Sequence, residues 1–490
     1  TTGSLIGDGT LSGVIGGGSG TATLGNANTL ATLGDFSAGT LVLNDGTALA
    51  IAGTVNTSSL DVSAASVTET TGSLIGDDTL SGVIGGAAIL NQPNTLAVLG
   101  NFSAGTLNLN DTSALGIAGT VDVPVIDITA ASLTETTGSI IGNGTLTGQL
   151  AGAAQLGNPN AFAVLGNFTA PTGLSLTDTE ALSVNGAVNA GPSAIILLGN
   201  NPLSVLAGSE VTAGNITLSA GSMAVDGLVH GGTSVALFSG AGNVTEDGTG
   251  TIVTPGTLTG NISGNAVLNG PSNVIAVLGS FVAGGSITLD AIDALSIAGP
   301  VTAGTLTAGA PIAVTDAGAL SVPGVMNAGS ITLTADSIAL TGTLQGTAAV
   351  DLVTTTGDLI EEGVGTIDLP TGTLTGAIAG SAALDGSNTI GALGSFLATG
   401  SIILDNAHSL DVVSTVSAGP SMLLNTGSND LTVAAGGLVN AGSVTLDGGN
   451  LLLYGDVSGA QAVSLGARGT ISETGALDTA LLTGSATATA

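Results

Sequence analysis

The 490-residue chain contains few of the side chains that usually carry out chemistry, and those it has are widely spaced. It has no Cys, two His residues and a single basic residue, Arg468, against 34 acids. Without Cys the chain has no thiolate nucleophile, zinc–thiolate site or iron–sulfur cluster. His230 and His408 lie in different repeats, too far apart along a repetitive chain to share a metal ion or a catalytic triad.

Paired carboxylates are the remaining route to catalysis, because a glycoside hydrolase needs two of them about 5–10 Å apart. Glu361 and Glu362 are adjacent, and on a strand adjacent side chains point to opposite faces. Asp290 and Asp293 are better spaced, but they lie where the sequence predicts a turn. A polysaccharide lyase would need basic groups near its substrate, and Arg468 is alone in a chain of net charge −33. We therefore expect no catalytic residues, no cofactor and no enzyme, with a polysaccharide-degrading enzyme as the remote alternative.

Acids that recur at one place in the sequence are the candidates for a metal site. Each closes the strand that follows a Leu-Gly-x-Phe segment, and they are Asp45, Asp111, Asp178, Asp290 and Asp405. In the structural interpretation, such an Asp accepts hydrogen bonds from the N–H groups of the turn. In the functional alternative it binds Ca²⁺ weakly, together with turn carbonyls and water. The nonapeptide GGxGxDxUx that builds stacked calcium sites is absent, which argues against a dedicated calcium ladder.

The composition of the chain excludes several kinds of partner. One Arg and no Lys cannot neutralise phosphates, so we expect no binding to nucleic acid and no basic attachment to an anionic membrane. The longest tight apolar run, residues 194–198, is far shorter than the ~18 residues of a spanning helix, which predicts no membrane span. Hydrophobic residues make up 43% of the chain, more than a disordered acidic chain contains.

An internal repeat determines which elements must position these residues. A motif around Leu-Gly-x-Phe occurs five times, and we interpret its aromatic side chains as plugs of the core: Phe36, Phe102, Phe168, Phe281 and Phe396. An acid before a Gly-rich turn also occurs five times: Glu69, Glu135, Glu246, Glu361 and Glu473. In both sets the spacing is short between the first copies and much longer between the later ones. They predict short units at 1–69 and 70–135, long units at 136–246, 247–361 and 362–473, and the start of a further unit at 474–490.

The long units contain a shorter period of about 20 residues, in which Ala-Gly precedes alternating apolar and polar residues. Residues 330–335 and 337–341 show this alternation, which is typical of short strands, and strong helix formers are nearly missing. The pattern predicts an all-β fold, a right-handed parallel β-helix or β-solenoid with about 20 residues per turn. We expect residues 1–490 to form one continuous solenoid, a single elongated rod. The alternative fold is an antiparallel sandwich. In a sandwich the lengths of the repeat units need not differ by whole turns, whereas in this sequence they do, which favours the solenoid.

Two segments of this period, residues 280–289 (SFVAGGSITL) and 324–333 (GVMNAGSITL), resemble the repeats of filamentous-haemagglutinin-like bacterial exoproteins. Members of that family are large surface adhesins built as right-handed β-helices, exported by two-partner secretion or as autotransporters. The resemblance covers most of the chain and lies in composition and period. It implies an extracellular location at the bacterial cell surface. The near absence of Lys and Arg departs from the family and argues against heparin-type binding.

These observations lead us to expect a structural shaft or fibre segment of a large secreted bacterial surface protein, serving adhesion, a surface filament or a biofilm matrix. Residues 1–5 and 473–477 are ordinary repeat segments, so the expected partners are further repeats of the same chain or a second copy, end to end or side by side. Surface glycans are a further candidate partner. The alternatives are a subunit of a head-to-tail filament and a lectin-like or calcium-dependent cohesion module.

Overall fold

A computed structural model of the chain describes residues 3–76, 78–304 and 309–487. The chain divides into two units, Thr1–Gly240 and Ala241–Ala490, which are described separately. The first unit contains the strands from β1 (Ile6–Val14) to β26 (Leu228–Ser239), and the second contains those from β27 (Val244–Glu246) to β52 (Leu482–Ala486). Over the described ranges, the one helical segment is a 3₁₀ turn at Gly16–Gly18.

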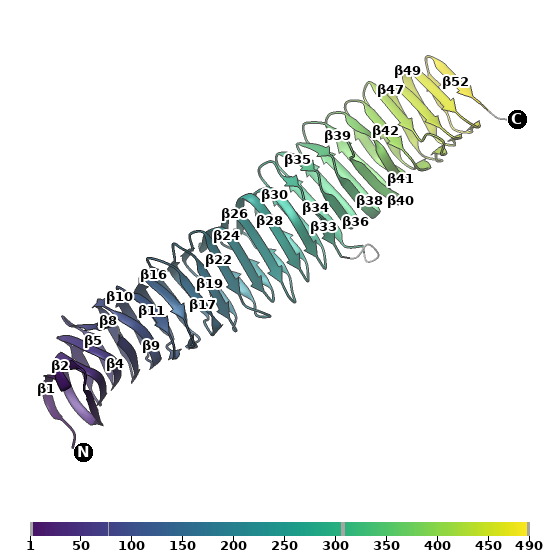
Figure 1. The fold of residues 1–490 in the computed structure, drawn as a ribbon. Helices are drawn as coiled ribbons and strands as arrows, with labels where there is room; N and C mark the ends of the chain where they lie inside the picture. Colours follow the sequence, from purple (N-terminus) through teal and green to yellow (C-terminus); the bar gives the residue numbers. More distant parts are fainter. Residues whose placement is uncertain (1–2, 77, 305–308, 488–490) are drawn as a thin grey trace. The chain divides into compact units, whose positions relative to one another are not determined.

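The strands within each unit pair in parallel with strands about one turn away in the sequence. In the first unit, Phe168 of β18 (Val164–Thr169) lies opposite Val188 of β21 (Ala187–Asn189), one turn further along the chain. Figure 1 shows such strands side by side, turn after turn, within each unit. Each unit is therefore a parallel β-solenoid with about 20 residues per turn, which confirms the predicted fold class. The continuity of one solenoid through residues 1–490 stays a prediction.

The alternation of residue types along each strand places the apolar side chains inside the solenoid. In β36 (Val325–Ala335), Ile331 and Leu333 are fully buried, while Ser330 and Thr332 are partly exposed. Successive side chains of a strand point to opposite faces, so a period of two in the sequence becomes an inner and an outer face. Burying one such Leu or Ile contributes about 1.5–3 kcal/mol, and the interior of both units is filled in this way.

The five marker phenylalanines lie inside the core, and each lies opposite a glycine of the preceding turn. The pairs are Gly13–Phe36, Gly82–Phe102, Gly148–Phe168, Gly260–Phe281 and Gly376–Phe396. A Cβ atom on Gly260 would lie 2.5 Å from Cε2 of Phe281, closer than two such atoms can approach. At Gly260, and likewise at Gly148 and Gly376, the missing side chain of the glycine therefore provides space that the aromatic ring occupies.

Replacing Gly260 with alanine should lower the free energy of unfolding of these turns by about 1–3 kcal/mol, because the ring of Phe281 must move to admit the methyl group. Gly157→Ala is the matched control, since a Cβ atom there meets nothing within 4 Å. Urea denaturation of the two variants measures the difference. Equal denaturation midpoints would show that the ring does not depend on the glycine.

Candidate functional site

The most regular polar feature of the interior is a contact between a buried or partly buried glutamate and an asparagine of the following turn. It is present in both units, at Glu69–Asn94, Glu135–Asn160, Glu246–Asn273 and Glu361–Asn388. These glutamates are four of the five acids that mark the sequence units. The fifth, Glu473, is exposed.

Glu361 shows the geometry of this contact most clearly. It ends β39 (Leu359–Glu361) with its side chain turned into the core, 5% exposed. Its Oε2 accepts hydrogen bonds from the N–H of Gly386 at 2.8 Å and from Nδ2 of Asn388 at 2.9 Å. Its Oε1 is also buried, but no group in the described part of the chain donates a hydrogen bond to it. The carboxyl group is therefore only half satisfied.

The other three glutamates have the same surroundings. In each case Oε2 accepts a backbone N–H of the following turn at 2.7–2.8 Å, and the pairs are Glu69 with Gln92, Glu135 with Asn158 and Glu246 with Gly270. In each case Oε1 is buried and receives no hydrogen bond from the residues that the structure describes. The half-satisfied carboxyl group is thus a property of the repeat and not of one turn.

The asparagine connects three consecutive turns. Asn388 is fully buried, its Oδ1 accepts the N–H of Ile367 at 2.7 Å, and its Nδ2 also donates to the carbonyls of Leu384 and Asp405, both at 3.2 Å. Asparagines of the other repeats accept a backbone N–H of the preceding turn in the same way: Asn28, Asn94, Asn160 and Asn273. An amide side chain suits this position because it both donates and accepts. Sequence reasoning missed these residues, although each opens a copy of the Leu-Gly-x-Phe motif.

Burial raises the pKa of the glutamates. The pKa rises from 4.5 to about 7 for Glu69, Glu135 and Glu361, and it also rises for Glu246. The main cause is desolvation, because the charged form loses its water on entering the core. The hydrogen bonds to Oε2 oppose this rise, whereas nearby aspartates add to it at two of the four sites.

Three of the five candidate calcium residues, Asp45, Asp111 and Asp178, are buried, and each accepts a hydrogen bond from a backbone N–H group of the preceding turn. Asp178 accepts the N–H groups of Phe162 at 2.9 Å and Glu180 at 2.8 Å. Desolvation raises the pKa of Asp111 and Asp178, with their hydrogen bonds opposing the rise. This arrangement matches the structural interpretation of these residues.

The other two candidates, Asp290 and Asp405, are not equivalent to the first three. They lie one residue earlier in their strands, β31 (Ile287–Ala291) and β42 (Ile402–Asn406), and are partly exposed. The buried position at the end of these strands is taken by an alanine and an asparagine. A shift of one residue turns a side chain to the other face of a strand, so these carboxylates face outward. Among the residues that the structure describes, no three His, Asp or Glu side chains gather to hold a metal ion.

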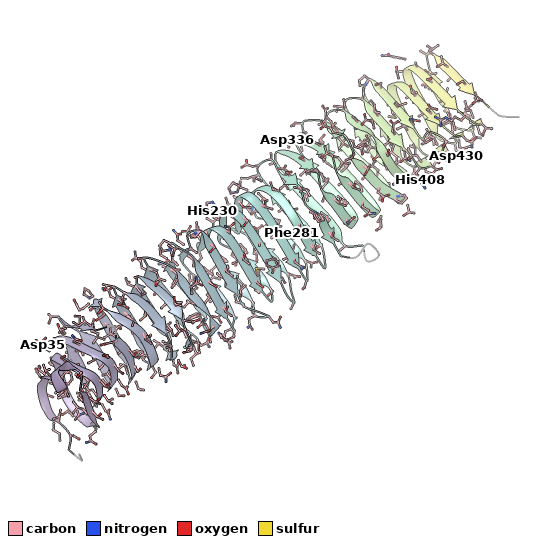
Figure 2. All side chains as sticks on the ribbon, viewed as in Figure 1. Asp35, His230, Phe281, Asp336, His408 and Asp430 are labelled. Carbon is pink, nitrogen blue, oxygen red and sulfur yellow. The ribbon has the colours of Figure 1, made fainter. Side chains whose placement is uncertain are left out.

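The other residues considered for catalysis lie apart. Glu361 is buried and Glu362 is exposed, which confirms that adjacent residues point to opposite faces. His230 is half-buried in β26 of the first unit, and His408 is exposed in the second unit, where its Nδ1 lies 2.9 Å from the carbonyl oxygen of Ser409 (Figure 2). Asp293 is exposed.

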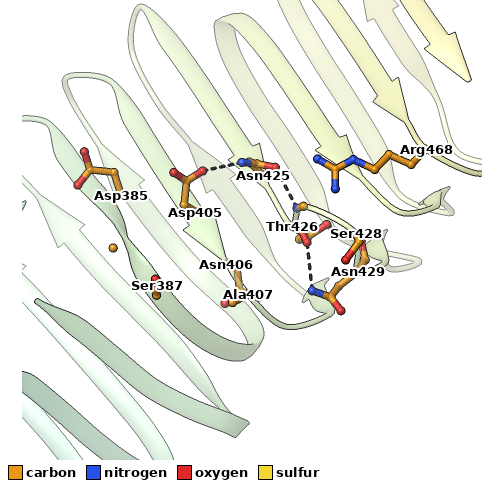
Figure 3. Close-up of a pocket in the computed structure, with 12 residues that line it drawn as sticks. Asp385, Ser387, Asp405, Asn406, Ala407, Asn425, Thr426, Ser428, Asn429 and Arg468 are labelled. Atoms are coloured by element: carbon orange, nitrogen blue, oxygen red, sulfur yellow. Dashed lines mark hydrogen bonds between the residues drawn. The ribbon is translucent and has the colours of Figure 1, made fainter. Parts of the chain in front are cut away.

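An open groove of about 540 Å³ in the second unit contains the single basic residue of the chain. Figure 3 shows Asp385, Asp405, Asn425 and Arg468 following one another along it. Nδ2 of Asn425 donates to Oδ1 of Asp405 at 2.8 Å. The residues that line the groove include no aromatic side chain on which a sugar could stack. The groove therefore offers hydrogen bonds at an open surface.

Comparison with models of protein families, with curated proteins and with solved structures finds no match to the chain. The resemblance to haemagglutinin-like repeats thus rests on the sequence pattern alone. None of the helical segments in the described ranges has the length and apolar character needed to cross a bilayer.

Proposed function

We propose that the chain is a non-enzymatic structural shaft of a secreted bacterial surface protein, which holds an attached part at a distance in adhesion, a surface filament or a biofilm matrix. The observation that carries this proposal is that most of the repeated polar side chains point into the solenoid. The recurring glutamates, asparagines and buried aspartates bind neighbouring turns of their own solenoid. Side chains that bind a ligand would instead face the solvent.

The bonds between turns also support a load-bearing role. β36 pairs with β38 (Thr343–Thr354) at ten positions, so two neighbouring turns share a long parallel ladder. Corner residues add further links, because Asp35, Asp336 and Asp430 accept hydrogen bonds from groups about one turn later (Figure 2). A solenoid held this way separates one turn at a time and resists bending between turns.

The composition supports an extracellular location. With Arg468 as the single basic residue, trypsin-like proteases have one place to cut, and that place lies in a solenoid turn. The resemblance to bacterial surface adhesins points the same way. Further repeats of the same chain or a second copy are the partners that such a shaft would take, and surface glycans are the partners of the lectin-like alternative.

Single-molecule stretching tests the shaft directly. A chain held at both ends should unravel in successive force peaks, each releasing one or a few turns, and one turn of about 20 residues adds about 70 Å of extended chain. Extension without force peaks would contradict the proposal, as would turnover of a polysaccharide by the purified chain. Glycan binding that is lost in Arg468→Ala would instead favour the lectin-like alternative.

A further inference from the structure

We propose that four glutamates, the buried Glu69, Glu246 and Glu361 and the partly buried Glu135, act as proton-controlled clasps between successive turns of the solenoid. With its carboxyl group protonated, each holds the following turn through a backbone N–H and an asparagine. When the group ionises, the uncompensated charge in the core loosens that turn. This inference goes beyond the proposed shaft, because it makes the cohesion of the turns depend on pH.

The first argument is the hydrogen bonding of the carboxyl oxygens. A carboxylate spreads its charge over two oxygens and needs donors at both. At Glu361, Oε2 has two donors, Gly386 and Asn388, whereas the buried Oε1 receives no hydrogen bond from any described residue. Burying a charged oxygen without a donor is far more costly than burying a neutral one. The site therefore fits a carboxylic acid better than a carboxylate.

The second argument is the charge around each site. The charges of Asp385 and Asp405 raise the pKa of Glu361, and the charge of Asp290 raises the pKa of Glu246. All three neighbours are acids, so they oppose the ionisation of the glutamates. The groups that act on Glu69 are the backbone of Gln92 and the amide of Asn94, which are neutral. Glu135 has the corresponding neutral partners Asn158 and Asn160. No basic side chain is among the groups that act on these four glutamates, so nothing compensates a negative charge there.

The third argument is repetition. The half-satisfied carboxyl group occurs at the same place in repeats of both units, each time opposite an asparagine of the following turn. An accidental buried charge would be an isolated feature. A group that recurs in both units gives their turns several points that respond together to one signal, the proton concentration.

The direction of the effect follows from the raised pKa values, about 7 in the folded chain for Glu69, Glu135 and Glu361 against 4.5 when unfolded. Below pH 4.5 both states hold the proton, and the contribution of the clasp to the free energy of unfolding is fully present. Between pH 4.5 and 7 the unfolded chain gives up its proton first, so the solenoid loses stability as pH rises. Above pH 7 both states are ionised and the loss is complete.

Carbon-13 NMR of the full chain, with only its glutamate carboxyl carbons labelled, tests the proposal. The chain has eight glutamates, and single Glu→Gln variants assign their signals. We expect Glu69, Glu135 and Glu361 to titrate near pH 7 and Glu246 above its ordinary value. Titration of these four glutamates near 4.5 would overturn the proposal.

A substitution pair separates the clasp from simple packing. Glutamine has the shape of the protonated acid and cannot ionise, so Glu361→Gln should raise the melting temperature by several degrees at pH 8 and change it little at pH 4. Glu362→Gln, at the exposed neighbouring position, removes the same charge and should show no such dependence on pH. If Glu361→Gln lowers the melting temperature equally at both pH values, the glutamate is only a structural contact and the proposal fails.

Discussion

Replacing Asn388 with alanine should lower the free energy of unfolding of the surrounding turns by about 3–5 kcal/mol, because several buried polar groups lose a partner together and each such loss costs about 1–3 kcal/mol. The substitution leaves the buried N–H of Ile367 without its acceptor and removes a donor from Glu361 and from the carbonyl of Asp405. Urea denaturation, combined with hydrogen exchange of peptides covering residues 361–406, measures the loss and locates it.

Asn440→Ala is the matched control for that experiment, because Asn440 is exposed and makes one long side-chain hydrogen bond, to Ser417 at 3.4 Å. Its effect should stay within about 0.5 kcal/mol. If the two alanine variants were equally stable, the asparagines could not be the connection between turns that the structure shows. The same result would weaken the case for a clasp at Glu361.

Replacing Phe281 with alanine should lower the free energy of unfolding by a similar amount, about 3–5 kcal/mol. The ring is fully buried opposite Gly260, and its removal leaves a cavity that the stacked turns cannot close. Phe238→Ala provides the comparison, since that ring is 40% exposed and should matter far less. Thermal and urea denaturation measure the stability of both variants.

The double variant Gly260→Ala with Phe281→Ala tests whether the two positions are coupled. Once the ring is gone, the methyl group at position 260 meets no obstacle there, so its own cost should vanish and the double variant should match Phe281→Ala alone. Strictly additive losses would show that the glycine is needed for the backbone and not for the ring.

Strand formation in this chain depends on the alternation of residue types within short segments, and the sequence alone was sufficient to predict it. Ile331 and Leu333 alternate with Ser330 and Thr332, and this period of two places them on the inner and outer faces wherever the strand lies. The period of about 20 residues then indicates stacked parallel turns, because each turn alone cannot bury its apolar face. The burial of the marker phenylalanines followed from the same reasoning.

The candidate sites depend on register between turns, which sequence spacing does not reveal. Asp178 and Asp405 occupy similar places in the motif, yet the first is buried and the second faces outward. A difference of one residue decides the face, and only the pairing of Asn160 with Asp178, and of Asn388 with Asn406, shows which residue is inside.

The sequence by itself determined the class of fold, the inner and outer faces of the strands and the scarcity of catalytic side chains, because composition and period are properties of short segments. The tertiary structure decided that three of the five marker glutamates, Glu69, Glu246 and Glu361, are buried. Glu361 is an acid before a Gly-rich turn in the sequence, and burial in the folded chain raises its pKa, although the hydrogen bonds from Gly386 and Asn388 oppose the rise. Those residues belong to the next turn, and only the stacking of turns removes water from the carboxyl group and raises its pKa.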